Sequence, residues 1–100
     1  MAEIEPGITN NTDESRYEIR LGDELVGHAV YTLNDGLITF THTEIDPAHE
    51  GKGLASKLVR FALDDVRADG TRKVLPLCPY VKGWMQRNTD DLDLAYNSAR

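Results

Sequence analysis

The feature that most constrains the fold is a change of hydrophobic period at Gly51-Lys52-Gly53. Before it, the segment from Leu37 to Ile45 is rich in Thr, Ile and Phe, which suit the partly buried surface of a β-strand. After it, apolar residues recur at spacings of three and four, as on one face of a helix. These residues are Leu54, Leu58, Phe61, Ala62 and Val66. The sequence therefore predicts a strand, a glycine turn, and an amphipathic helix from about Gly53 to Ala68.

The glycine turn is predicted to bind phosphate, because glycine has no Cβ to keep a ligand away from backbone N–H groups. The first N–H groups of a helix lack intrahelical partners and lie at the positive end of its dipole. A Walker A loop does not fit, because Gly53 follows Lys52 and Asp46 stands where that loop begins with glycine. A dinucleotide-binding fingerprint fits poorly, because Ser56 stands in place of its third glycine.

A third phosphate-binding turn fits best, because three motifs occur in order. They are His42-Thr43-Glu44-Ile45-Asp46-Pro47, Gly51-Lys52-Gly53-Leu54-Ala55 and Pro76-Leu77-Cys78-Pro79-Tyr80-Val81. With them, the chain from about Tyr17 to Leu94 resembles the small, minimal acetyltransferase-like family of the Gcn5-related N-acetyltransferase superfamily. The resemblance implies that the G-x-G turn holds the pyrophosphate of coenzyme A. The chain departs from the usual pattern at Ala48, and at Asn88-Thr89-Asp90-Asp91, where the family often has a His-Pro-Glu-Tyr-like segment.

The predicted fold class is α/β of the α+β type, with a minimal core like that of this superfamily. Strands are expected at Arg16–Leu21, Leu25–Leu33 and Leu37–Ile45, and they would form a three-stranded antiparallel meander. After the main helix, Lys73–Cys78 is expected to form a fourth strand parallel to the third. Pro76 would interrupt its pairing, so that the two strands splay apart. Tyr80–Arg87 is expected to be a short second helix.

The domain boundaries follow from composition. Residues 1–15 offer almost nothing to bury and are predicted to be a disordered tail. Residues 16–94 are predicted to form one acetyl-CoA-binding domain, and residues 95–100 a frayed C-terminus.

Charge and composition exclude several classes of protein. A formal net charge of -6 argues against nucleic-acid binding and favours a cationic acceptor, such as an amine or a basic peptide. The single cysteine rules out an internal disulfide. The sequence shows neither a signal peptide nor a membrane-spanning apolar segment, so a cytoplasmic location is expected. The expected assembly state is a monomer or a weak dimer.

The predicted cofactor is acetyl-CoA, and the residues expected to bind it lie around the glycine turn. They are Ile45, Gly51, Lys52, Gly53, Leu54 and Ala55, acting chiefly through backbone amides. Lys52 would add positive charge, or it would be a solvated residue at the start of the helix.

Cys78 is the first candidate for a catalytic residue, because the family resemblance places a cysteine here near the acetyl thioester. Acetyl transfer would proceed either through an acetylated thiolate or by direct attack of an amine, with Cys78 near the leaving sulfur. The alternative is that Cys78 is simply a small buried apolar residue. The superfamily often uses a tyrosine after this strand as a general acid, and Tyr80 is close to that position.

His42 and Glu44 are the other two catalytic candidates. They lie two residues apart on one strand and therefore share a face. If that face lines the cleft, His42 would be a general base and Glu44 would take an amine proton or attract a cationic acceptor. Otherwise His42 is a packing residue and Glu44 a solvated charge. His49 is expected to be a surface loop residue. No pair of zinc-ligand spacing joins His42, His49 and Cys78, so no metal is predicted.

The predicted function is acetyl-CoA-dependent transfer of an acetyl group to a small-molecule amine or a peptide. The alternative is an acyl-CoA-binding or protein-interaction module with little or no turnover. The sequence does not identify the acceptor.

Overall fold

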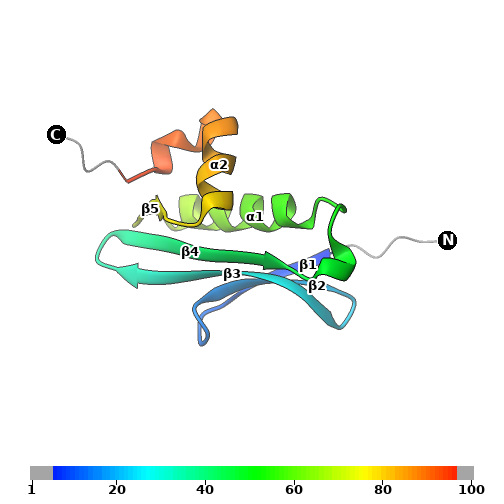
Figure 1. The fold of residues 1–100 in the computed structure, drawn as a ribbon. Coiled ribbons are helices and arrows are strands. Elements are labelled where there is room, and N and C mark those ends of the chain that lie inside the picture. Colours follow the sequence, from blue (N-terminus) through cyan, green and yellow to red (C-terminus); the bar gives the residue numbers. More distant parts are fainter. Residues whose placement is uncertain (1–5, 97–100) are drawn as a thin grey trace.

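The computed structural model describes residues 6–96, in which five strands form one mixed sheet in the order β1-β2-β3-β4-β5. The strands are β1 (Pro6–Asn11), β2 (Arg16–Leu21), β3 (Glu24–Asn34), β4 (Leu37–Ile45) and β5 (Lys73–Pro76). The helices are α1 (Leu54–Asp69) and α2 (Pro79–Arg87), with short 3-10 helices at η1 (Pro47–His49) and η2 (Thr89–Leu94). Neighbouring strands from β1 to β4 are antiparallel, and β5 runs parallel to β4. Both α-helices lie on the same side of the sheet (Figure 1).

The structure confirms the predicted α+β class, the main helix, the parallel strand and the second helix. Strands β2 and β4 have the predicted bounds, β3 is longer than predicted by one residue at each end, and β5 ends at Pro76, two residues before the predicted end at Cys78. These elements were predictable because their hydrophobic periods and turn residues are local signals.

The prediction of a disordered tail was wrong from residue 6 onward. Strand β1 pairs antiparallel with β2, so the meander has four strands rather than three. Ile8 lies opposite Ile19 in this pairing and packs against the core. Most side chains of β1 are polar, and a strand at a sheet edge needs few apolar residues because neighbouring backbone supplies its hydrogen bonds. Residues 1–5 lie outside the described part of the chain.

Helix α1 covers the sheet with a stripe of six buried side chains. These are Leu54, Leu58, Val59, Ala62, Leu63 and Val66. Phe61, which was predicted to face the sheet, is 38% exposed, and its ring centroid lies 6.2 Å from that of Tyr17 in an edge-to-face arrangement. At 100° per residue the buried side chains span the arc from Leu54 to Leu63, and Phe61 falls just beyond its Leu54 end. Gly70 ends the helix in the left-handed conformation, and its N–H donates to the Val66 carbonyl.

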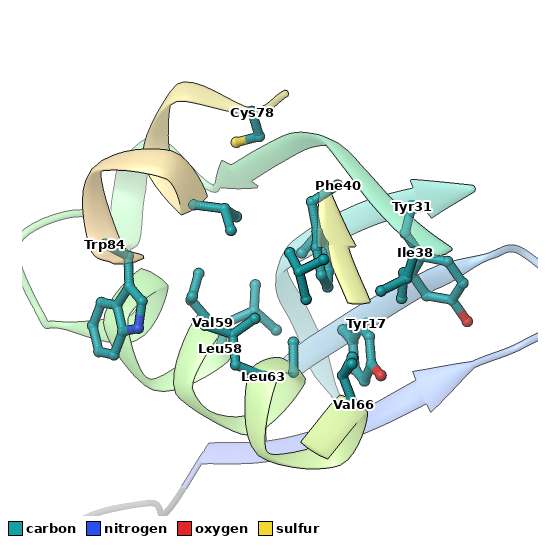
Figure 2. Close-up of a cluster of buried hydrophobic side chains, with 14 of the residues drawn as sticks. Tyr17, Tyr31, Ile38, Phe40, Leu58, Val59, Leu63, Val66, Cys78 and Trp84 are labelled. Carbon is teal, nitrogen blue, oxygen red and sulfur yellow. The ribbon is translucent and has the colours of Figure 1, made fainter. Parts of the chain in front are cut away.

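The core lies between this stripe and the inner face of the sheet (Figure 2). The sheet contributes the rings of Tyr17, Tyr31 and Phe40, whose centroids are 5.4 to 6.2 Å apart. Trp84 of α2 is buried on the far side of the cluster, and the Arg60 guanidinium lies 5.2 Å from its ring centroid. Close-packed aromatic groups of this size dominate the energy of a small core, so truncating Phe40 would cost about 3–5 kcal/mol.

The acidic segment after α2 is held against the domain. Asp91 is 2% exposed and accepts hydrogen bonds from Arg60 and Arg67 of α1. Ala95 pairs with Val74, and the Tyr96 N–H donates to the Val74 carbonyl at 2.7 Å. The prediction of a frayed C-terminus at 95–100 was therefore wrong for residues 95 and 96, whose backbone pairs with β5 at Val74. Residues 97–100 lie outside the described part.

Within residues 6–96, neither helix has the length and hydrophobicity needed to cross a lipid bilayer.

Candidate functional site

A hollow of about 360 Å³ opens where the end of β4 meets the start of α1. It is lined by Thr43, Ile45, His49, Glu50, Gly51, Gly53, Leu54, Ala55, Ser56 and Tyr80. The lining thus comes from β4, the connection that follows it, the first turn of α1 and the first turn of α2. Five of the six predicted cofactor-binding residues belong to it, and Lys52 does not.

The glycine turn in this hollow exposes backbone N–H groups. Gly51 and Gly53 have φ angles of 85° and 74°, in the left-handed region that glycine adopts most easily. A Cβ added to either glycine would meet no atom within 4 Å, so both backbones face open space. Gly53 caps α1 without a side-chain hydrogen bond. The first amides of the helix are therefore left for a ligand, and this arrangement suits an anion such as a phosphate group.

The edge of β4 that faces β5 is paired over only part of its length. The ladder between the two strands ends at Phe40 and Pro76, as predicted from the proline. One more hydrogen bond follows, from the Cys78 N–H to the Phe40 carbonyl at 2.8 Å. Between His42 and Ile45, β4 pairs with β3, and the described residues provide no strand on its other side. Backbone groups on such an edge can pair with an extended ligand.

A β-bulge decides which side chains of β4 face the hollow. Val30 pairs with His42 and the next residue, Tyr31, pairs with Phe40, so Thr41 is an extra residue in β4. A one-residue bulge reverses the alternation of side chains beyond it. Thr43 and Ile45 therefore follow Phe40 on the helix side of the sheet.

Gly27 of β3 lies opposite Ile45 and allows the two strands to approach closely. A Cβ at this position would lie 2.9 Å from the Glu44 carbonyl oxygen and would clash with the end of the Ile45 side chain. The glycine thus makes room for Ile45, which forms one wall of the hollow.

Cys78 lies beside the hollow, between β5 and α2, at the edge of the core (Figure 2). Its side chain is 3% exposed, and its thiol donates a hydrogen bond to the Thr43 hydroxyl, with Sγ and Oγ1 3.2 Å apart. The residue is also the N-cap of α2. Tyr80, two residues later, lines the hollow. Thr43 was not predicted as a site residue from the sequence, because only the bulge in β4 brings it to the helix side of the sheet.

The structure does not bring His42 and Glu44 to Cys78. Beyond the bulge they lie on the opposite face of the sheet, where their side chains are 58% and 64% exposed. The general-base role of His42 required its face of β4 to line the cleft. This hollow is lined by Thr43 and Ile45, which lie on the other face, so the requirement is not met here. His42 is not a buried packing residue either. Both side chains instead approach His28 of β3.

His49, predicted to be a surface loop residue, forms part of the wall of the hollow. Its side chain is 17% exposed and lies between two charged groups: Nε2 is 3.5 Å from Glu24, and Nδ1 is 3.2 Å from the Lys52 ammonium. Lys52 is thus oriented next to the turn, although its side chain does not line the hollow.

Comparisons with known proteins agree with this fold. The family model described as GCN5-related N-acetyl-transferase matches residues 16–94. A GCN5-like protein from Staphylococcus aureus, solved by NMR, superposes with a TM-score of 0.69 at 17% identity, covering 100% of this chain and 95% of its own. No match was found among curated protein sequences.

Two longer structures share the fold. A GNAT family acetyltransferase from Brucella melitensis, solved in complex with acetyl-CoA, has a TM-score of 0.60 at 22% identity over 73% of this chain. The ribosomal-protein-S18-alanine N-acetyltransferase from Escherichia coli has a TM-score of 0.56 at 15% identity over 59% of this chain. This chain spans 50% and 38% of those two proteins.

The family model covers most of the chain and includes the glycine turn, the bulged strand and Cys78. The chain belongs to the GCN5-related N-acetyltransferase family.

Proposed function

We propose that this protein binds acetyl-CoA in the hollow at the start of α1 and transfers the acetyl group to an amine. One observation carries the proposal: a single hollow joins the uncapped glycine turn of α1 to the unpaired edge of β4. The turn suits the pyrophosphate, and the strand edge suits the amide-containing arm of the cofactor. The fold shared with a relative that was solved with acetyl-CoA supports the same assignment.

The residues proposed to act at the acetyl group are Cys78, Thr43 and Tyr80. In acetyl transfer the neutral acceptor amine bonds through its nitrogen to the acetyl carbon and gives up a proton to solvent, the carbon–sulfur bond breaks, and the leaving sulfur takes up a proton. The Tyr80 hydroxyl is our candidate donor of that proton, because Tyr80 lines the hollow and follows Cys78 by two residues. Cys78 would either accept the acetyl group itself or donate a hydrogen bond near the leaving sulfur.

An amine acceptor is supported by charge. The protein has a formal net charge of -6. A second hollow of about 540 Å³ adjoins the first, shares Ile45 and Glu50 with it, and also contains Asp46. Carboxylates at such a site raise the local concentration of cations and suit a protonated amine on its way to the acetyl group.

The proposal is tested in two steps that separate an enzyme from a binding module. Acetyl-CoA and coenzyme A should each raise the melting temperature, because a ligand that binds only the folded state stabilises it. Release of free thiol from acetyl-CoA is then measured with a panel of polyamines, lysine-containing peptides and neutral amines. Amine-dependent release would support the enzyme. A melting shift without release would support the acyl-CoA-binding module, and no shift at millimolar acetyl-CoA would overturn both.

A further inference from the structure

Three side chains of types that can bind metals lie close together on the face of the sheet opposite α1 and α2. No described helix covers that face (Figure 1). His28 of β3 pairs directly with Glu44 of β4, and His42 lies two residues before Glu44 on the same face. One oxygen, Oε1 of Glu44, lies 3.6 Å from Nε2 of His28 and 3.6 Å from Nε2 of His42. All three potential ligand atoms lie within 4.8 Å of one another.

These distances are close to those that a bound metal ion needs. Zinc binds imidazole nitrogen and carboxylate oxygen at about 2.0–2.2 Å, and a tetrahedral arrangement places two such ligands about 3.4 Å apart. The two contacts of 3.6 Å to the Glu44 oxygen therefore require a contraction of only a few tenths of an ångström. The ligand atoms of the two imidazoles, which lie within 4.8 Å of each other, require a larger movement. His42 and Glu44 are exposed, so their side chains are free to make this adjustment.

The positive charge nearest to consider is Arg16, which acts on His28 and would repel a cation at the cluster. The Arg16 guanidinium is held 2.7 Å from Glu18, which offsets its repulsion of a cation at the cluster.

We propose that His28, His42 and Glu44 form a binding site for a divalent transition-metal ion. Two imidazoles and one carboxylate are ligands that suit zinc and its neighbours among the first-row metals, with the remaining positions filled by water. Such an ion would join β3 to β4 next to the bulge in β4, outside the proposed acetyl-CoA hollow but at the second hollow, which His28 and Glu44 also line. The site does not depend on the proposed acetyltransferase activity.

No metal site was predicted from the sequence, because the only candidate ligands compared with His42 were His49 and Cys78. The bulge in β4 and the register of β3 separate His42 from both of those residues and bring it to His28 instead. Ligands that come from two paired strands carry no short spacing motif in the sequence.

The first measurement uses the untagged wild-type chain. Zinc chloride is titrated by calorimetry in a non-chelating buffer, and the imidazole signals are followed by NMR. We expect one ion per chain, an increase in melting temperature, and shifts of the His28 and His42 ring signals but not of the His49 signals. His49 is the internal control, because it lies near Glu24 and Lys52 rather than in the cluster.

Substitutions then test the ligands. His28→Gln, His42→Gln and Glu44→Gln should each weaken zinc binding by about tenfold or more, whereas His49→Gln should leave it unchanged. Circular dichroism establishes that each variant is folded. The proposal is overturned if the wild-type chain binds no zinc at millimolar concentration, if His49 shifts in place of His28 and His42, or if the cluster variants bind zinc as the wild type does. The NMR readout decides the question even if a variant fails to fold.

Discussion

Cys78 and Thr43 are 35 residues apart in the sequence, yet their Sγ and Oγ1 atoms lie 3.2 Å apart at one end of the proposed acetyl-CoA hollow. Two features produce this contact. The ladder between β4 and β5 ends at Pro76, and the backbone then brings Cys78 to β4 through its hydrogen bond to Phe40. The bulge at Thr41 turns Thr43, rather than His42, toward the helix side.

We expect Cys78→Ala to bind acetyl-CoA as the wild type does and to lose most acetyl transfer. The cofactor is proposed to bind through the glycine turn and the β4 edge, whereas the thiol acts at the acetyl group. A side chain that takes part in acyl or proton transfer contributes about a hundredfold or more to the rate. Cys78→Ser distinguishes the two routes, because a hydroxyl can still bond to Thr43 but is a much poorer nucleophile.

The control for this substitution is Val81→Ala, which also truncates a buried side chain at the start of α2 but lies outside the lining of the hollow. It should lower stability while the rate for the folded protein stays near that of the wild type. If Cys78→Ala transfers acetyl normally, the thiol is a packing residue.

Gly53→Ala should weaken coenzyme A binding more than its effect on stability explains. The alanine Cβ would project into open space at the proposed phosphate site, and φ at this residue is 74°. The left-handed conformation costs an L residue roughly 1 kcal/mol. The matched control is Gly36→Ala, because Gly36 has φ of 68°, also faces open space, and lies in the distant turn between β3 and β4.

The two alanine variants should therefore lose similar stability in urea unfolding, whereas only Gly53→Ala should show a raised Kd for coenzyme A. Equal Kd values for the two variants would mean that the phosphates bind elsewhere.

Glu18 should make stability depend on pH in the acid range. Burial tends to raise its pKa, but hydrogen bonds from Arg16, Asn11 and Arg20 outweigh burial and lower the pKa below the ordinary value of 4.5. A lowered pKa in the folded state means that the carboxylate stabilises the protein above about pH 4.5, and that this contribution is lost as pH falls through the folded-state pKa.

We expect Glu18→Gln to cost about 1–2 kcal/mol at pH 7 and progressively less toward pH 3, measured as the free energy of unfolding at each pH. Glu14→Gln, at an exposed glutamate in the turn before β2, serves as the control for general charge effects. A gap between wild type and Glu18→Gln that stays constant from pH 7 to pH 3 would contradict this account.

Asp91→Asn should destabilise the protein more than Asp93→Asn does. Both carboxylates bind Arg67, but Asp91 is 2% exposed and also contacts Arg60, whereas the Asp93 side chain is 64% exposed. Loss of a buried charged partner costs about 1–3 kcal/mol, and water replaces an exposed one readily. Thermal unfolding of the two variants measures the difference, and equal losses would show that the burial of Asp91 does not strengthen its contribution.

Much of the fold was predictable from local patterns. The bounds of β2 and β4, the main helix and the glycine turn follow from hydrophobic period and glycine placement, which act within a few residues. Pro76 likewise predicted the end of the β4–β5 ladder, because proline cannot donate a ladder hydrogen bond. The family resemblance rested on these same residues, and the match to residues 16–94 confirmed it.

The tertiary structure decided which side chains meet. Strand β1 has too few apolar residues to be recognised by itself and owes its place to pairing with β2. The faces of Thr43 and His42 depend on a single extra residue in β4, and the contact between His28 and Glu44 depends on the register with β3. Alternation along a strand is a local property of the sequence. A bulge and a register are settled by packing between segments far apart in the chain, because a shift of one residue exchanges the buried and exposed faces.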